Sequence, residues 1–435
     1  MKRPISLLTA FFILSIIGSH FTNPAFAENR TLTLEEAIRL AMAHSPDALI
    51  AGAEARQAEE ALRETRSYNL PRAVIGSGAA YNKGLPMNNE GGAPSIFRID
   101  ANQPVLNIQN RNLIREASES AKAARIGSDI AGNELAARTA IIYYRLDQAR
   151  KIAVFAESRL GEANKQQEWA KIDIETGRGR PIDVKIAEGS IAGARQQLLT
   201  AKEQARVAEA ELRELVRFND TISINTITPP MESPIFNMEA DALFEKTAAS
   251  SPEILQAEAK ILAKEYAVAA AKAEQYPQLD AIGSYGMLSR SNNYEDYYKR
   301  FERNTYLIGI SAQFPLFDGN RAKARVARSR EEQSIERLNL NSLKSNLKLN
   351  IEKGLSAVRI ARGAVDVTVI DLEIAEEIVG TSEILLESGR IGEREMADLR
   401  LQVRQKELAK LEAEHELFLR KIELLRVTGS ILTVF

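Results

Sequence analysis

The sequence predicts a mainly α-helical protein that also contributes four β-strands to a membrane, and three observations support this fold class. First, sequence markers recur at a nearly constant offset, which indicates two internal repeats. Second, each repeat contains two segments that alternate in polarity over about nine to eleven residues, the length of a tilted transmembrane strand. Third, long segments of helix-forming residues carry a coiled-coil pattern.

The amino terminus has the features of a secretory signal peptide. Lys2 and Arg3 precede the apolar run Leu7–Ile17, and a small-x-small cleavage site follows at Ala25–Ala27. We therefore expect residues 1–27 to be removed and the mature chain to begin at Glu28. No other segment offers a run of about twenty apolar residues. The sequence thus predicts an exported protein without a transmembrane helix.

Composition excludes several functional classes. The 435-residue chain has no cysteine, three histidines and a net charge of −2, so disulfides, thiolate sites, a lipidated cysteine and a histidine metal cluster are not expected. The charge gives no sign of nucleic-acid binding. No nucleophile and histidine pair, phosphate loop or metal motif is present, so we expect neither an enzyme nor a bound metal or cofactor.

The internal repeat divides the chain into a first repeat at 28–218, a linker at 219–238 and a second repeat at 239–435. The markers are a Ser-Pro-acid tripeptide, two prolines and a glycine interruption of the helical pattern. Their positions are Ser45 and Ser251 (206 apart), Pro71 and Pro277 (206), Pro104 and Pro315 (211), and Gly177 and Gly389 (212). We interpret the second half as a homologue of the first.

Each repeat has two alternating segments, at 71–82 and 95–104 and at 277–288 and 304–315. In the last of these, aromatic residues bound an apolar face that runs from Tyr306 to Phe314. The segment that contains Arg98 and Asp100 is charged on one face only, which suits a strand with a wet lumen behind it. Two ordinary hairpins in a soluble sheet remain the alternative interpretation.

After each strand pair the helical pattern resumes, and it predicts helical hairpins at 105–218 and 316–428. The outgoing segment 105–176 would reach about 108 Å as one helix. The return segment has a coiled-coil seam with 3,4 spacing. The seam comprises Val184, Ala187, Ile191, Ala194, Leu198, Ala201, Ala205, Ala208, Leu212 and Leu215. A similar seam over 397–425 is interrupted by Arg404 and His415, and we interpret His415 as a tolerated seam residue rather than a ligand.

The glycine interruptions predict the turns of these hairpins. In "ETGRGRPIDVKIAEG" and "ESGRIGEREMADLRL", Gly177 and Gly389 supply a helix-ending conformation, and Pro181 suits the first turn of a return helix. Four membrane strands cannot close a barrel, because an open edge in lipid leaves backbone groups unsatisfied. Three copies would supply twelve strands, so we expect a trimeric barrel that continues as a hollow α-helical tube.

With these features, the whole mature chain resembles the TolC-type family of outer-membrane efflux and secretion channels, the outer membrane factors. The resemblance rests on the repeat, the "SP…P" helix, "QFPLFDGNR", "SGR…MADLR" and the ending "LLRVTGSIL". It implies a homotrimer in outer-membrane lipid with a large periplasmic portion. It further implies an exit duct that receives cargo from an inner-membrane transporter and a periplasmic adaptor (membrane fusion) protein. The cargo class, drug, metal ion or protein, stays open.

The resemblance also implies which tip residues matter. Family members place acids after the tip glycine at the periplasmic constriction, which implies this role for Asp183, Glu395 and Asp398. Rings of these acids would favour cations. The helix dipole also favours acids in a first turn, so a purely structural role stays open.

Arg178 and Arg390 stand where many family members have Leu or Thr in a motif that meets the adaptor. These arginines either contact the adaptor, pair with tip acids to hold the entrance shut, or are solvated caps. The competing overall hypothesis is a periplasmic coiled-coil adaptor or scaffold without a pore. An adaptor usually has one hairpin between small β-domains, whereas this chain predicts two hairpins and four membrane strands.

Overall fold

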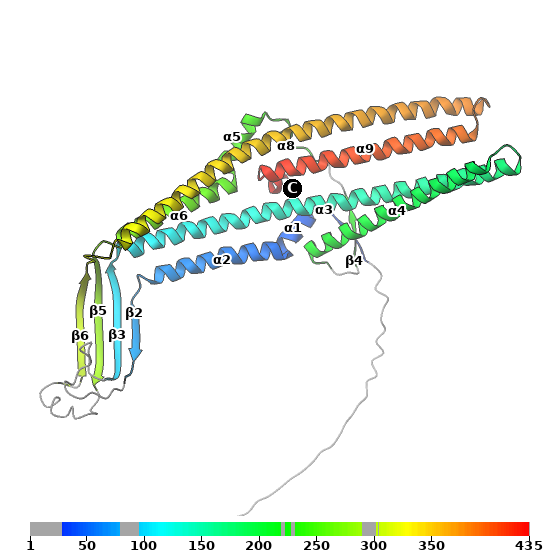
Figure 1. The fold of residues 1–435 in the computed structure, drawn as a ribbon. Coiled ribbons are helices and arrows are strands. Elements are labelled where there is room, and N and C mark those ends of the chain that lie inside the picture. Colours follow the sequence, from blue (N-terminus) through cyan, green and yellow to red (C-terminus); the bar gives the residue numbers. More distant parts are fainter. Residues whose placement is uncertain are drawn as a thin grey trace, which may run out of the picture.

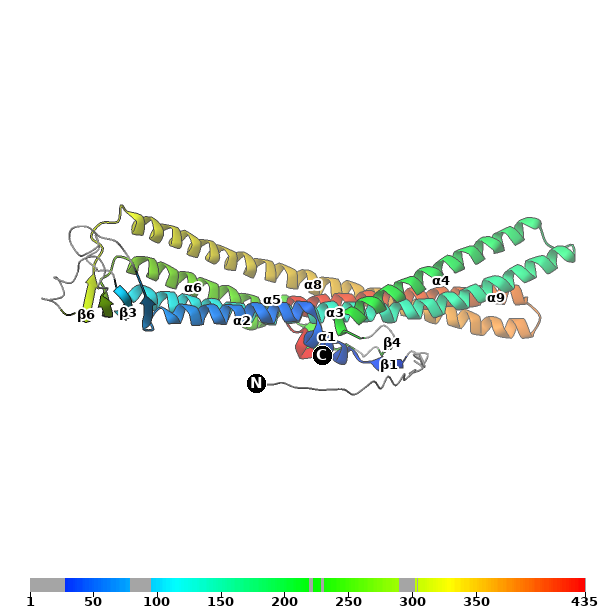
Figure 2. The ribbon, with the colours of Figure 1, turned by 90° about the horizontal axis from the view of Figure 1, so that it is seen from below.

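The computed structural model describes residues 28–78, 95–218, 222–227, 231–288, 302 and 304–434. The molecule is elongated, with a β-sheet at one end, two hairpin tips at the other and a small mixed region between them (Figure 1). The turned view in Figure 2 shows the same separation of sheet and tips. The predicted signal peptide at 1–27 lies outside the described residues.

The two repeats have elements of matching length. The first repeat contains β1 (Glu28–Leu32), α1 (Leu34–His44), α2 (Pro46–Ser67), β2 (Arg72–Gly76), β3 (Ser95–Leu106), α3 (Ile108–Glu175) and α4 (Pro181–Val216). The linker contains β4 (Ile222–Thr226) and the 3₁₀ helix η1 (Pro234–Asn237). The second repeat contains α5 (Ala240–Ser250), α6 (Pro252–Ala273), β5 (Gln278–Leu288), β6 (Asn304–Gln313), α8 (Arg321–Glu387), α9 (Glu393–Val427) and α10 (Ile431–Val434).

Local signals explain where the helices begin. Ser45 and Ser251 cap α2 and α6 through their side-chain oxygens, and a proline occupies the first helical position of each. The predicted helix start at 105 is too early, because Pro104 still pairs in the sheet and Asn107 caps α3 by accepting from the Asn110 N–H at 2.9 Å. The predicted start at 316 is also early, since the Asp318 carboxylate caps α8 at Ala322.

The larger sheet is antiparallel in the order β2-β3-β5-β6. Its register places Phe97, Tyr285 and Tyr306 on one face with the apolar residues of β6, whereas Arg98 and Asp100 lie on the other face. The strand predicted at 71–82 is described only as β2, and residues 79–94 lie outside the described part of the chain. The other three predicted strands begin and end within two residues of their predicted bounds.

Each long helix is flanked by two shorter ones. Helix α3 packs against α2 near the sheet and α4 near the tip, and α8 packs similarly against α6 and α9 (Figure 1). At about 1.5 Å per residue, the 68-residue α3 spans roughly 100 Å. Of the α4 seam, Ala187, Ile191, Ala194, Ala201, Ala208, Leu212 and Leu215 are buried, and the other three are half-buried. The coiled-coil prediction is therefore confirmed.

A hydrophobic core lies midway along the molecule, where α1, β4, α5 and the ends of α4 and α9 surround α3 and α8. Tyr143 of α3 is fully buried there, and its hydroxyl lies 2.7 Å from the Leu32 carbonyl oxygen. The same hydroxyl accepts from the Ile227 N–H at 2.7 Å. Burial raises the pKa of Tyr143 to about 12. The tyrosine thus ties the parallel β1–β4 pair to the long helix.

Candidate functional site

Both hairpin tips use the same helix-ending motif. Gly177 and Gly389 have φ of 72° and 71°, in the left-handed region that glycine adopts readily. The following N–H of Arg178 donates to the Asp173 carbonyl at 2.8 Å, and that of Arg390 donates to the Leu385 carbonyl at 2.9 Å. Together with the glycine N–H bonds, these make a Schellman motif at each tip.

The Asp183 carboxylate is hydrogen-bonded at the start of its own helix, α4. Its carboxylate accepts from the Arg180 backbone N–H and from the Arg180 guanidinium, each at 3.1 Å. These bonds lower the pKa of Asp183, and the charge of Arg394 contributes in the same direction. The structure therefore places Asp183 in a capping arrangement at the start of α4, in which its charge is partly neutralised.

The acids of the second tip have fewer partners. Glu395 is exposed in the first turn of α9, and within the described residues neither a hydrogen bond nor an ion pair joins it to another side chain. Asp398 is exposed and accepts from the Gln166 amide of α3 at 3.2 Å. The two repeats therefore differ at their predicted constriction residues, although their backbones match.

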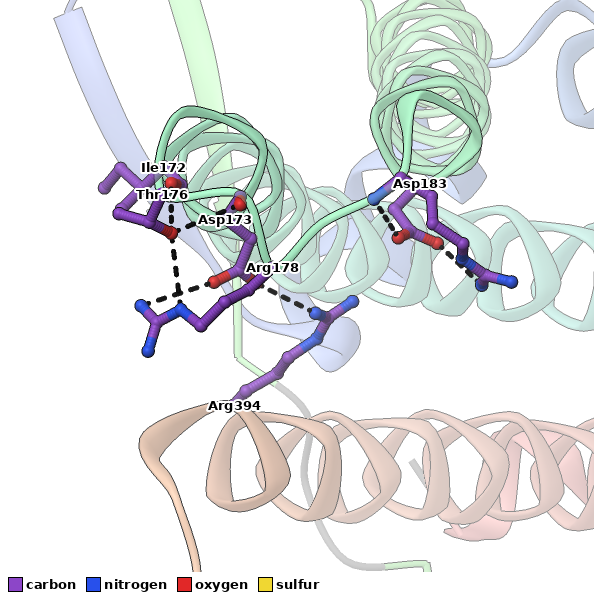
Figure 3. A network of polar contacts seen from close by, with 7 residues as sticks. Ile172, Asp173, Thr176, Arg178, Asp183 and Arg394 are labelled. Carbon is purple, nitrogen blue, oxygen red and sulfur yellow. Dashed lines mark hydrogen bonds and ion pairs between the residues drawn. The ribbon is translucent and has the colours of Figure 1, made fainter.

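An ion pair joins the two hairpins at their tips, as Figure 3 shows. The Arg394 guanidinium of α9 lies 3.2 Å from the Asp173 carboxylate of α3, and the Arg178 guanidinium lies 3.9 Å from the same carboxylate. We call the Asp173–Arg394 pair the tip clasp. Sequence analysis missed both residues, because their contact crosses 221 positions of the chain. Arg390 is exposed and takes part in none of the ion pairs of the described residues.

A groove of about 460 Å³ lies between the two hairpins behind the clasp. Trp169 of α3 and Val403 of α9 contribute apolar surface, and Lys165, Arg400 and Glu407 contribute charge. The described residues contain no group of three or more acidic or histidine side chains suited to a metal ion. None of the described helices is both long and apolar enough to span a bilayer.

This architecture matches that of a known protein family. A family model described as outer membrane efflux protein matches residues 37–216 and again residues 243–430, one match in each repeat. The chain belongs to the outer membrane efflux protein family. Members of this family are transport channels of the outer membrane, so the localisation expected from the sequence is confirmed.

The chain is similar in sequence to a curated outer membrane efflux protein and similar in fold to solved outer-membrane channels. Outer membrane efflux protein BepC of Brucella suis biovar 1 (strain 1330) is 23% identical over 290 residues, or 66% of this chain, and this chain spans about 61% of that protein's length. VceC of Vibrio cholerae has a TM-score of 0.75 at 17% identity, over 91% of this chain and 96% of that one. The Campylobacter jejuni CmeC outer membrane channel has a TM-score of 0.75 at 15% identity, over 98% and 94%.

Proposed function

We propose that this efflux family member is a trimeric exit duct that passes cargo from an inner-membrane transporter and a periplasmic adaptor to the exterior. The observation that carries the proposal is the four-stranded sheet, which is too small to close by itself and is continued by two helical hairpins of roughly 100 Å. Within the described residues, β2 and β6 each have one edge without a partner strand. Pairing β6 of one copy with β2 of the next, three times, closes a twelve-stranded barrel.

An apolar stripe on α8 supports association of the helical portion. Its side chains are exposed in the single chain. Its members are Ile360, Val367, Ile370, Ile374, Ile378 and Ile384. A contiguous exposed apolar surface marks an interaction site, and in the trimer a neighbouring copy covers this stripe.

Disulfide crosslinking tests the trimer, since the chain has no native cysteine. Ala73→Cys in β2 is combined in turn with Ile308→Cys, Ile310→Cys or Ala312→Cys in β6. One register brings the Cβ atoms to the roughly 4 Å that a disulfide needs, and oxidation then yields covalent trimers. Ala101→Cys in the central strand β3 replaces Ala73→Cys as the control and gives none. Monomers in every combination would contradict the barrel and favour a scaffold without a pore.

The tip acids give the duct its cation preference in this proposal. Glu395 and Asp398 are exposed and form the effective acidic ring, whereas Asp183 is tied to Arg180. We expect Glu395→Gln combined with Asp398→Asn to reduce cation selectivity in the reversal potential of single channels. Asp183→Asn has a smaller effect, because its charge is already partly neutralised. An equal or larger shift from Asp183→Asn would refute this division of roles.

A further inference from the structure

We infer that the start of α8 forms a binding patch for anionic phospholipids of the bilayer, an inference that rests on the proposed function, in which the sheet spans the membrane. The patch comprises Leu316, Phe317, Arg321 and Lys323 and lies at the end of the sheet where β6 leads into α8 (Figure 1). We call it the junction patch. It combines exposed apolar side chains with exposed cations, the two features through which a protein surface holds a charged lipid.

The exposed face of β6 sets the level of the patch relative to the membrane. This face runs from Tyr306 to Phe314, and Ile310 between them is 78% exposed. Phe314 follows Tyr306 by eight residues, which is about 26 Å along a strand and matches the apolar band of roughly 25 Å between the aromatic girdles of membrane barrels. Leu316 and Phe317, each 88% exposed, lie just beyond this band on the side of the helices. They are therefore at the level of the lipid headgroups.

The charge at the start of α8 is the reverse of what a helix favours. The helix dipole favours acids in the first turn, and α1, α2, α4, α5, α6 and α9 each have an acid there. The first ten residues of α8, RAKARVARSR, contain five basic residues and no acid. The first ten residues of α3, IQNRNLIREA, contain two basic residues and one acid. Because α8 itself gains nothing from these cations, we attribute them to a contact outside the chain.

Three of the five cations have no carboxylate partner in the described part of the chain. Arg325 and Arg328 each form an ion pair with a glutamate. Arg321, Lys323 and Arg330 are exposed, and no ion pair joins them to another side chain among the described residues. Of these three, Arg321 and Lys323 lie in the first turn and are nearest the sheet. Two cations beside two exposed apolar side chains are thus available to an anion at the membrane surface.

The chemistry of the patch favours a phospholipid over other anions. An arginine fork binds a phosphate through two parallel hydrogen bonds, and a lysine adds a point charge. Leu316 and Phe317 add apolar surface for acyl chains, which a free phosphate does not have. Each Lys or Arg near an anionic lipid surface strengthens binding about fivefold, so two cations predict a preference of roughly fivefold to thirtyfold over zwitterionic lipid. Acids of a neighbouring copy are the alternative partner, and they would give no such preference.

Quenching of tryptophan fluorescence by brominated lipids tests the patch in proteoliposomes that contain the purified full-length channel. Phe317→Trp places an aromatic reporter in the patch. Trp169 is the only native tryptophan, and it lies roughly 90 Å along α3 from the start of that helix, beyond the reach of the bilayer. We expect brominated phosphatidylglycerol to be favoured over brominated phosphatidylcholine at least about fivefold at about 0.1 M salt. The preference should weaken at about 1 M salt.

Two double variants in the Phe317→Trp protein show whether the cations cause this preference. Arg321→Gln/Lys323→Gln should lower the ratio of the two binding constants to about one, and it should not impair folding, since the helix dipole disfavours cations at this end. The matched control is Lys353→Gln/Arg359→Gln, which removes two exposed cations roughly 50 Å further along the same helix. Neither control residue forms an ion pair within the described residues, and its removal should leave the ratio unchanged.

Tyr306→Trp, on the exposed face of β6, separates the junction patch from the proposed function. Quenching of the Tyr306→Trp protein without quenching of the Phe317→Trp protein would place the sheet in the bilayer and overturn the patch alone. Quenching of neither protein would count against a membrane-spanning sheet and so against the proposed function. A ratio near one before the cations are removed would overturn the patch in favour of pairing with a neighbouring copy. An unchanged ratio after Arg321→Gln/Lys323→Gln, or an equal loss in the control, would also overturn it.

Discussion

Removing the tip clasp should favour the open entrance. In the Asp173–Arg394 pair, the Arg394 side chain is 62% exposed and the Asp173 side chain 28% exposed, so solvent screens it strongly. Such a pair contributes about 0.2–1 kcal/mol. If the three tips of a trimer open together, the loss amounts to roughly 0.6–3 kcal/mol, or about a 3- to 150-fold change in the ratio of open to closed channels.

Single-channel recording in planar bilayers measures this ratio directly. We expect Asp173→Asn and Arg394→Ala to raise open probability at about 0.15 M salt. The difference should shrink at about 1 M salt, where the screening length falls to roughly 3 Å. Asparagine suits the test, because it removes the negative charge while nearly keeping the size of the side chain, and the backbone bonds from Arg178 and Gly179 to the carbonyl of residue 173 do not depend on the side chain.

The matched control is Arg400→Ala. Arg400 also lies on α9, but it pairs with Glu383 of α8 within the same hairpin, at 3.4 Å. Its removal weakens one hairpin without releasing the two hairpins from each other. Equal opening by Arg400→Ala and Arg394→Ala, or no effect of Asp173→Asn at low salt, would refute the clasp.

Three further predictions concern stability. Gly177→Ala or Gly389→Ala should each lower the free energy of unfolding by about 1–2 kcal/mol in denaturant, because the backbone at both positions is left-handed. Gly363→Ala, in the interior of α8 where an added Cβ meets nothing, should raise the free energy of unfolding by about 0.5–1 kcal/mol. The opposite order would contradict the tip geometry. Burial lowers the pKa of His415 below its usual 6.5, so the unfolded chain binds the extra proton. Unfolding free energy should therefore fall as pH drops below about 6.5, and His415→Gln should flatten that dependence. Tyr143→Phe should cost about 1–3 kcal/mol by leaving the Ile227 N–H unpaired, and a neutral result would show that this N–H finds another partner.

The sequence predicted the fold well where the signal was local or repeated. Seam positions such as Ile191 follow helical spacing. Each tip glycine interrupts a helical pattern, and a proline follows soon after the first of them, whereas mostly polar residues follow the second. Helices α1 and α5 were not predicted, although Thr33 caps the former and both lie at the repeat offset of 206 residues. The capping and repeat signals of these helices were present in the sequence, but each helix has only 11 residues, and a short helix gives a weak periodic pattern.

The candidate site was less accessible from sequence. Asp183 and Glu395 each follow their tip glycine by six residues, so their spacing alone made these two acids equivalent, and Asp398 lies one helical turn further on. The three-dimensional arrangement separates Asp183 from the other two acids. The N-cap of α4 is Arg180, which pairs with Asp183, whereas the N-cap of α9 is Gly392, which has no side chain to pair with an acid. The tip clasp forms where the two hairpins come together in the folded chain, and the spacing of residues along the sequence does not predict that contact.

Conductance of the purified wild-type protein in a planar lipid bilayer tests the central claim most directly. The account predicts discrete current steps, with larger or longer openings after Asp173→Asn. A wild type that is silent while Asp173→Asn conducts would indicate a duct closed at rest, in agreement with the account. Silence from both, in protein shown to be folded by circular dichroism and to be inserted by co-flotation with liposomes, would contradict a pore.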